Sequence, residues 1–128
     1  MAIVQLKGQR VSDLQFVNKL ENGTRVELGN KYNYSVNYSN ENICRGELSI
    51  EVADKDDPAK FSIRAVLIGI FEFDPQTEKE RVHVQTFKEL FPYVRALITT
   101  VTANCGIPPV IVPPIDIEGQ EIYRFEKN

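Results

Sequence analysis

Three kinds of side chain in this sequence could carry out acid–base, nucleophilic or metal chemistry: one histidine, two cysteines and one acidic turn. His83 lies in a polar stretch, so we expect a solvated surface imidazole rather than a general base. Cys44 and Cys105 are far apart, and neither has a second cysteine at the spacing of a metal site. This pattern indicates two buried free thiols in a reducing compartment.

The acidic turn at residues 54–58 crowds three aspartates before a proline. It lacks the ordered ligand spacing and the terminal glutamate of a calcium loop, so we expect a solvated turn. The sequence also has no glycine-rich phosphate loop, no His-Glu-x-x-His pair and no nucleophile elbow. We therefore predict a protein that is not an enzyme, with no catalytic residue, no metal and no cofactor. The alternative is a site assembled from distant residues near Asp13, Glu72 or His83.

Length and charge restrict the remaining classes of function. A chain of 128 residues with 42% hydrophobic and 26% charged residues predicts a single globular domain over residues 1–128. The net charge of −3 disfavours a nucleic-acid binder, which needs a clustered basic surface. The longest uncharged apolar stretches, 65–71 and 96–103, are shorter than the ~20 residues of a membrane helix. With no signal-peptide pattern at the start, we expect a cytoplasmic protein without membrane insertion.

Apolar and polar residues alternate along the first half of the chain, as in strands that have one buried and one wet face. The runs at 26–38 and 44–52 flank a polar turn and should form a hairpin. In the N-terminal run the alternation slips near Gly8, which indicates a β-bulge. The predicted strands cover residues 3–19, 24–38, 43–53 and 60–73.

The last of these strands is apolar on both faces. Val66, Ile68 and Ile70 lie on one face, and the odd-numbered positions from 61 to 73, which are also apolar, lie on the other. Such a strand is either covered by two layers or part of an assembly surface. We therefore predict that these three residues form subunit contacts, together with Val94 and Val101 of the helix described next.

After the strands, apolar residues recur every three or four positions and predict one amphipathic helix over 84–105. Gly106 fits just past its end. Four prolines among aliphatic residues then predict an extended segment over 107–117 laid on the protein surface. The predicted fold class is α+β: a four-stranded antiparallel sheet, one main helix packed on one face, and a proline-rich extended C-terminal segment.

The junction of helix and extension carries a family resemblance. Residues 90–95 read Leu-Phe-Pro-Tyr-Val-Arg, and residues 106–115 combine glycine, proline pairs and aliphatics. Ser-Asp-Leu-Gln-Phe at 12–16 and Gly-Ile-Phe at 69–71 fit the strand region of the same family. Over nearly its whole length, the chain resembles the protein-export chaperone SecB.

The resemblance implies an ATP-independent holdase that binds unfolded or precursor polypeptides in apolar grooves. It also implies a homo-oligomer, dimer or tetramer, which passes preproteins to the translocase motor SecA. A holdase needs accessible apolar surface with a polar rim. Seven residues on the strands are candidates for a peptide groove: Tyr32, Tyr34, Val36, Phe61, Ile63, Ala65 and Leu67.

Partner docking is expected at Asp13, which matches an acidic position of the family. This chain carries Val17 and Arg64 where the family has two further acidic residues that face SecA. The alternative function is therefore an oligomeric interaction or regulatory module that keeps the SecB fold and has no export role.

Overall fold

The computed structural model describes residues 3–21, 23–39 and 42–115. Four strands precede one helix: β1 (Val4–Asn18), β2 (Leu28–Tyr38), β3 (Ile43–Asp54), β4 (Phe61–Phe73) and α1 (Lys79–Ala103). All strand pairs are antiparallel. The predicted fold class, a four-stranded antiparallel sheet followed by one helix, is confirmed.

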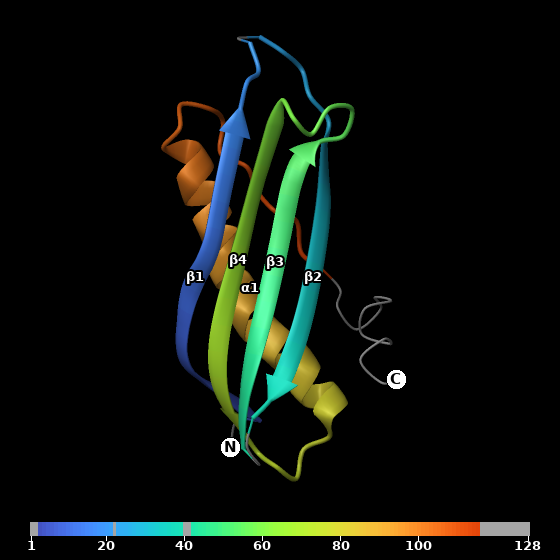
Figure 1. Ribbon diagram of the computed structural model, residues 1–128, viewed down its shortest axis with the longest axis vertical. Helices are drawn as coiled ribbons and strands as arrows, with labels where there is room; N and C mark the ends of the chain where they lie inside the picture. The colour runs from blue at the N-terminus through green and yellow to red at the C-terminus, as the bar shows by residue number, and fades with distance from the viewer. Residues whose placement is uncertain (1–2, 22, 40–41, 116–128) are drawn as a thin grey trace.

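The strands lie in the order β1-β4-β3-β2 (Figure 1). The predicted hairpin of β2 and β3 is present, with Tyr38 opposite Cys44 next to the turn. β1 and β2 are neighbours in sequence but form opposite edges of the sheet. Their connection, residues 19–27, therefore crosses one end of the sheet. β2 begins at Leu28, four residues after the predicted start at residue 24.

Two irregularities interrupt the pairing of β1 with β4. One lies between Leu6 and Gly8 and the other between Val11 and Asp13. The first is the bulge expected near Gly8. The second was not expected, and it shifts the alternation again, so that Val11, Leu14 and the core residues of β4 share one face of the sheet.

α1 covers one face of the sheet, and the core lies between them (Figure 1). Alternate residues of β3 and β4 point into this core, and several are fully buried, including Leu48, Ile50 and Ile63. The helix packs tightly against β4 at Gly69, where the missing side chain leaves room for Leu90. No described element covers the opposite face, which we call the open face of the sheet.

The helix begins at Lys79, five residues before the expected start at 84. The polar run that precedes Val84 is therefore its first turn, and it places Val82 and His83 against the sheet. His83 is only 3% exposed, so the prediction of a solvated surface histidine is wrong. The side of the helix on which His83 lies determines its exposure, although its neighbours in the sequence are polar. Pro92 lies inside the helix, which continues past it to Ala103.

The two cysteines have different environments. Cys44 is buried in the core as expected, but Cys105 is exposed, so the prediction that both thiols are buried is wrong for the second. Cys105 falls after the end of the helix, where the chain turns away from the core. Gly106 follows with a φ of 79°, a conformation that favours glycine.

After Gly106, the proline-rich segment up to Ile115 forms no helix or strand and lies against the protein surface, running back along α1. Its side chains alternate between the protein and solvent: Val112 is buried and Ile111 is 71% exposed. The last two residues of the expected segment, 116–117, lie outside the described residues. Within the described part of the chain, no helix has the length and apolar character needed to cross a membrane.

Candidate functional site

The residues predicted to line a peptide groove all lie on the face of the sheet that α1 covers. Six of them are buried, and only Tyr32 is half-buried. The six are Tyr34, Val36, Phe61, Ile63, Ala65 and Leu67. Strand alternation placed them correctly on one face, but the helix fills the space above them. The groove expected along these residues is therefore closed in the protomer, and open apolar surface lies elsewhere.

The predicted assembly residues divide between the two faces. Val66, Ile68 and Ile70 lie on the open face; of these three, Ile70 is exposed, and Val66 and Ile68 are buried. Val94 is fully buried and packs in the core, and Val101 is half-buried against it. As long as α1 stays on the sheet, Val94 is not available for a subunit contact.

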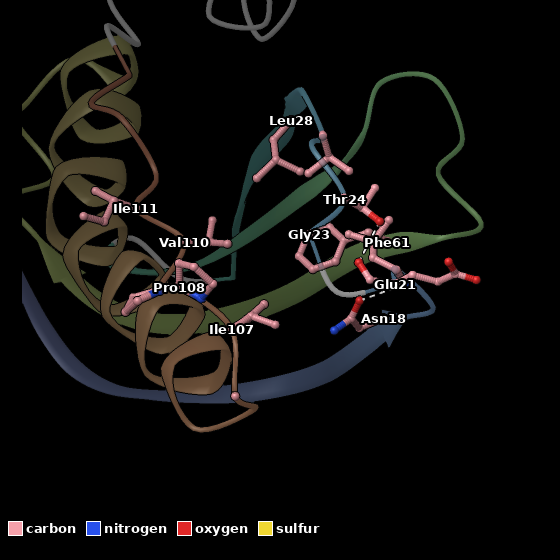
Figure 2. Close-up of a pocket in the computed structure, with 14 residues that line it drawn as sticks. Asn18, Glu21, Gly23, Thr24, Leu28, Phe61, Ile107, Pro108, Val110 and Ile111 are labelled. Atoms are coloured by element: carbon pink, nitrogen blue, oxygen red, sulfur yellow. Dashed lines mark hydrogen bonds between the residues drawn. The ribbon is translucent and has the colours of Figure 1, made fainter.

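A cavity of about 560 Å³ opens at the end of the sheet where the chain crosses from β1 to β2, and its exposed surface is nearly equally polar and apolar (Figure 2). One wall is the crossing connection and the start of β2, and the other is the proline-rich segment. Phe61, at the start of β4, lies between them and is the one groove candidate that reaches this cavity. Its volume is in the range of pockets that bind small ligands or short peptide segments.

Most of the described lining residues are aliphatic residues and prolines, and Glu21 is the only charged residue among them. The apolar lining residues are Leu20, Val26, Leu28, Phe61, Ile107, Pro108, Pro109, Val110 and Ile111. Polar groups at its edge include Asn18, whose side-chain oxygen accepts a hydrogen bond from the backbone N–H of Leu20 (3.1 Å). A surface that mixes apolar side chains with polar groups is suited to bind an extended polypeptide through both its side chains and its backbone.

Sequence reasoning missed most of this lining. Leu20 and Val26 are isolated aliphatics in a polar connection, so no periodicity marked them. The signal on the other wall was present, since the proline-rich segment carries more aliphatic side chains than a surface linker needs. The sequence did not predict that the two segments meet. That contact depends on the connection between β1 and β2, which lie at opposite edges of the sheet.

A buried polar cluster lies under the first half of α1. The hydroxyl of Tyr34 donates to Thr86 Oγ1 (2.5 Å), which donates to the backbone carbonyl of His83 (3.1 Å). The rings of Tyr34 and His83 pack 5.1 Å apart. Burial raises the pKa of Tyr34 and lowers that of His83, and it raises the pKa of Cys44 to about 11. Burial thus favours the neutral form of each group, and the hydrogen bond of Tyr34 to Thr86 joins β2 to α1.

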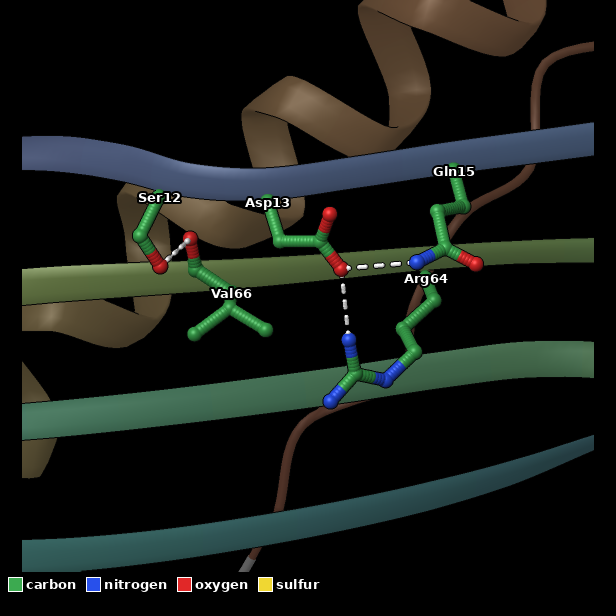
Figure 3. Close-up of polar contacts among 5 residues, drawn as sticks. All are labelled: Ser12, Asp13, Gln15, Arg64 and Val66. Atoms are coloured by element: carbon green, nitrogen blue, oxygen red, sulfur yellow. Dashed lines mark hydrogen bonds and ion pairs between the residues drawn. The ribbon is translucent and has the colours of Figure 1, made fainter.

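Asp13 lies on the open face and is engaged by its neighbours (Figure 3). Its Oδ2 atom is 2.7 Å from Arg64 Nη1 and accepts a hydrogen bond from the side-chain amide of Gln15 (3.0 Å). Ser12, at the second bulge, donates to the carbonyl of Val66 (3.4 Å). The carboxylate expected to dock a partner is thus paired with the arginine that replaces an acidic residue of the family.

Comparisons with known proteins agree with this architecture. The sequence profile of the family described as preprotein translocase subunit SecB matches residues 5–127. The chain belongs to the SecB family. SecB proteins are chaperones and not enzymes, in agreement with the absence of catalytic motifs from the sequence. Among the described residues, no cluster of histidine, cysteine or acidic side chains is arranged to hold a metal ion.

Two curated relatives illustrate the range of similarity. An uncharacterized protein of Methanocaldococcus jannaschii is 37% identical over an alignment of 100 residues, and the match covers 73% of this chain and 63% of that protein. The protein-export protein SecB of Erythrobacter litoralis is 29% identical over an alignment of 102 residues, and the match covers 77% of this chain and 57% of that protein. The chain thus matches about three-fifths of the length of these relatives.

A solved structure shows the same SecB fold. The SecB-like chaperone of Mycobacterium tuberculosis, in complex with a peptide from the HigA1 antitoxin, superposes with a TM-score of 0.69. The match covers 88% of both chains at 14% sequence identity. At this identity, the likeness concerns the arrangement of strands and helix.

Proposed function

We propose that this protein is a chaperone that binds non-native segments of other polypeptides, with a role in protein export. The observation that carries the proposal is the cavity between the crossing connection and the proline-rich segment, which is lined mostly by apolar residues. Its exposed rim includes Ile111, a large aliphatic side chain 71% open to solvent. A client that covers such side chains gains roughly 25 cal/mol for each Å² of apolar surface removed from water.

Binding of this kind requires no nucleotide, because apolar burial alone supplies the driving force. We therefore propose an ATP-independent holdase that acts in the cytoplasm. We also propose a homo-oligomer, dimer or tetramer, assembled in part along β1. Support comes from the edge position of β1 and from the exposed side chains of Val11 and Leu14 beside the helix. Edge strands with exposed apolar residues favour pairing with another chain.

The experiment follows the aggregation of a chemically denatured model protein by light scattering, with the chaperone added in increasing amounts and without ATP. The wild-type chain should delay aggregation in proportion to its concentration. Ile111→Asp should weaken client binding about tenfold, because it places a charge where an apolar contact worth ~1–3 kcal/mol is expected. Since Ile111 is mostly exposed, its replacement should leave the thermal midpoint unchanged.

Gln76→Asp is the matched control, because it introduces the same charge at an exposed turn that does not line the cavity. It should suppress aggregation as the wild type does. Unchanged scattering with an excess of the wild-type chain would refute the holdase proposal. Equal activity of Ile111→Asp and Gln76→Asp would move the client site away from the cavity.

A second candidate function is a SecB-fold interaction module that serves a dedicated partner and has no export role. The observation that favours it is the ion pair of Asp13 with Arg64, which neutralises the acidic position expected to face SecA. The wild-type chain should then bind immobilised SecA weakly, as measured by surface plasmon resonance. The double variant Val17→Glu/Arg64→Glu should bind it more tightly. Tight binding of SecA by the wild type would rule out this alternative and support export.

A further inference from the structure

The backbone of Val110 is held by two threonine side chains of α1. Thr99 Oγ1 donates to the carbonyl of Val110 (2.7 Å), and the N–H of Val110 donates to Thr102 Oγ1 (2.8 Å). The Thr102 hydroxyl donates in turn to the carbonyl of Ile98 (2.8 Å) and is fully buried. Both backbone polar groups of one residue are therefore satisfied by helix side chains, as a strand partner would satisfy them in a sheet.

This arrangement accounts for a feature of the sequence that helix propensity does not explain. Residues 99–102 read Thr-Thr-Val-Thr, which is a poor sequence for the interior of a helix. The proline-rich segment, for its part, has few N–H groups with which to pair, because four of its residues are prolines. Threonines at 99 and 102 supply one donor and one acceptor at the place where the segment keeps an N–H.

A second anchor lies further along the segment. Arg95 Nε donates to the carbonyl of Val112 (2.8 Å), and the side chain of Val112 is buried. At the other end, Gly106 turns the chain with its positive φ. Residues 106–111 form one wall of the cavity. This wall begins at the turn and is attached to α1 at Val110 and, just beyond its end, at Val112.

We propose that Thr99 and Thr102 are positioning residues that hold the proline-rich wall of the cavity in the geometry that receives a client. The proposal rests on the proposed function. A wall fixed before binding loses less conformational freedom when the client arrives, so affinity rises without any new contact to the client. We call the two hydrogen bonds between Val110 and the threonines the latch. Without the latch, the segment pivots about Gly106 and the cavity loses its shape.

The test compares Thr102→Val, which keeps the shape of the side chain but removes the hydroxyl, with Thr102→Ser, which keeps the hydroxyl. The client is a reduced, carboxymethylated protein that stays unfolded, titrated by fluorescence anisotropy. We expect Thr102→Val to weaken client binding about tenfold, equivalent to 1.4 kcal/mol, and Thr102→Ser to restore most of it. Thr99→Val should show a smaller loss, because a carbonyl tolerates an absent donor better than a buried N–H tolerates an absent acceptor.

Hydrogen exchange gives a readout that does not depend on the client. In Thr102→Val, the amide of Val110 should exchange at least tenfold faster, while amides in the centre of β3 and β4 keep their protection. Wild-type client affinity in Thr102→Val would overturn the positioning role. Slow exchange at Val110 in that variant would overturn the latch itself. Absence of client binding by the wild type would instead refute the proposed function, and the exchange result would still decide whether the latch exists.

Discussion

The contact between Gly69 and α1 allows a sharp prediction about the packing of helix on sheet. A Cβ atom added at Gly69 would lie 2.6 Å from Leu90 Cδ2 and 3.0 Å from Phe71 Cε1. Carbon atoms in favourable contact are about 3.5–4.0 Å apart, so Leu90 or the helix must move by roughly 1 Å. Leu90 and Phe71 are fully buried in a close-packed core, which leaves them little space to yield.

Overpacking of this kind costs about 1–3 kcal/mol. For a domain of this size, we expect Gly69→Ala to lower the thermal midpoint by roughly 4–11 °C, as measured by circular dichroism. Gly8→Ala is the matched control in the same sheet, because no atom lies within 4 Å of the added methyl group. Its midpoint should stay within about 2 °C of the wild type, since exposed substitutions change stability by less than ~0.5 kcal/mol.

A double variant tests the assigned cause. Leu90→Ala alone leaves a cavity and should cost about 2–5 kcal/mol. In that background the methyl group added at Gly69 has room, so Gly69→Ala should cost almost nothing there. Equal midpoints for Gly69→Ala and Gly8→Ala, or the same cost of Gly69→Ala in both backgrounds, would refute the close approach of helix and sheet at this point.

Three further predictions concern the buried groups. Tyr34→Phe should lower the free energy of unfolding by about 1 kcal/mol in urea titrations, because it removes the buried hydrogen bond to Thr86; an unchanged midpoint would contradict that bond. Burial lowers the pKa of His83 below its ordinary value of 6.5, so the unfolded chain takes up the proton first. Stability should therefore be full above pH 6.5 and fall as the pH drops below it, and His83→Gln should flatten this dependence in urea titrations; the same slope in both proteins would argue against the buried imidazole. Cys105 should react with a thiol reagent in the native chain, whereas Cys44, with a raised pKa and no exposure, should react only after unfolding; rapid reaction of both thiols would argue against the packing of Cys44.

The sheet was predictable because alternation has a period of two and polar turns separate the runs. The strand order was not, because alternation does not say which strands are neighbours. Nothing local in β1 indicates that it pairs with β4, nor that residues 19–27 must then cross the sheet. The cavity follows from that crossing, so its lining could not be assembled from sequence even though Ile107 and Ile111 stood out as surplus aliphatics.

The groove candidates show a different limit. Period-two alternation placed Tyr34, Ile63 and Leu67 on one face but could not tell whether that face meets a helix or a client. His83 shows a third limit, because its environment depends on a helix start that the polar residues before Val84 concealed. In each case the missing information was a tertiary contact rather than a local preference.

The pairing of β1 with β4 has a consequence for the order in which the chain folds. The partners in this ladder are roughly forty to seventy residues apart in sequence, whereas β2, β3 and β4 follow one another through short turns. Loop-closure entropy therefore delays the β1–β4 ladder relative to the other two. During synthesis β1 leaves the ribosome first but must wait until β4 has emerged. Until then the edge of β4, with its apolar residues on both faces, is uncovered, so a protein that we propose protects other unfolded chains is itself exposed to aggregation late in its own folding.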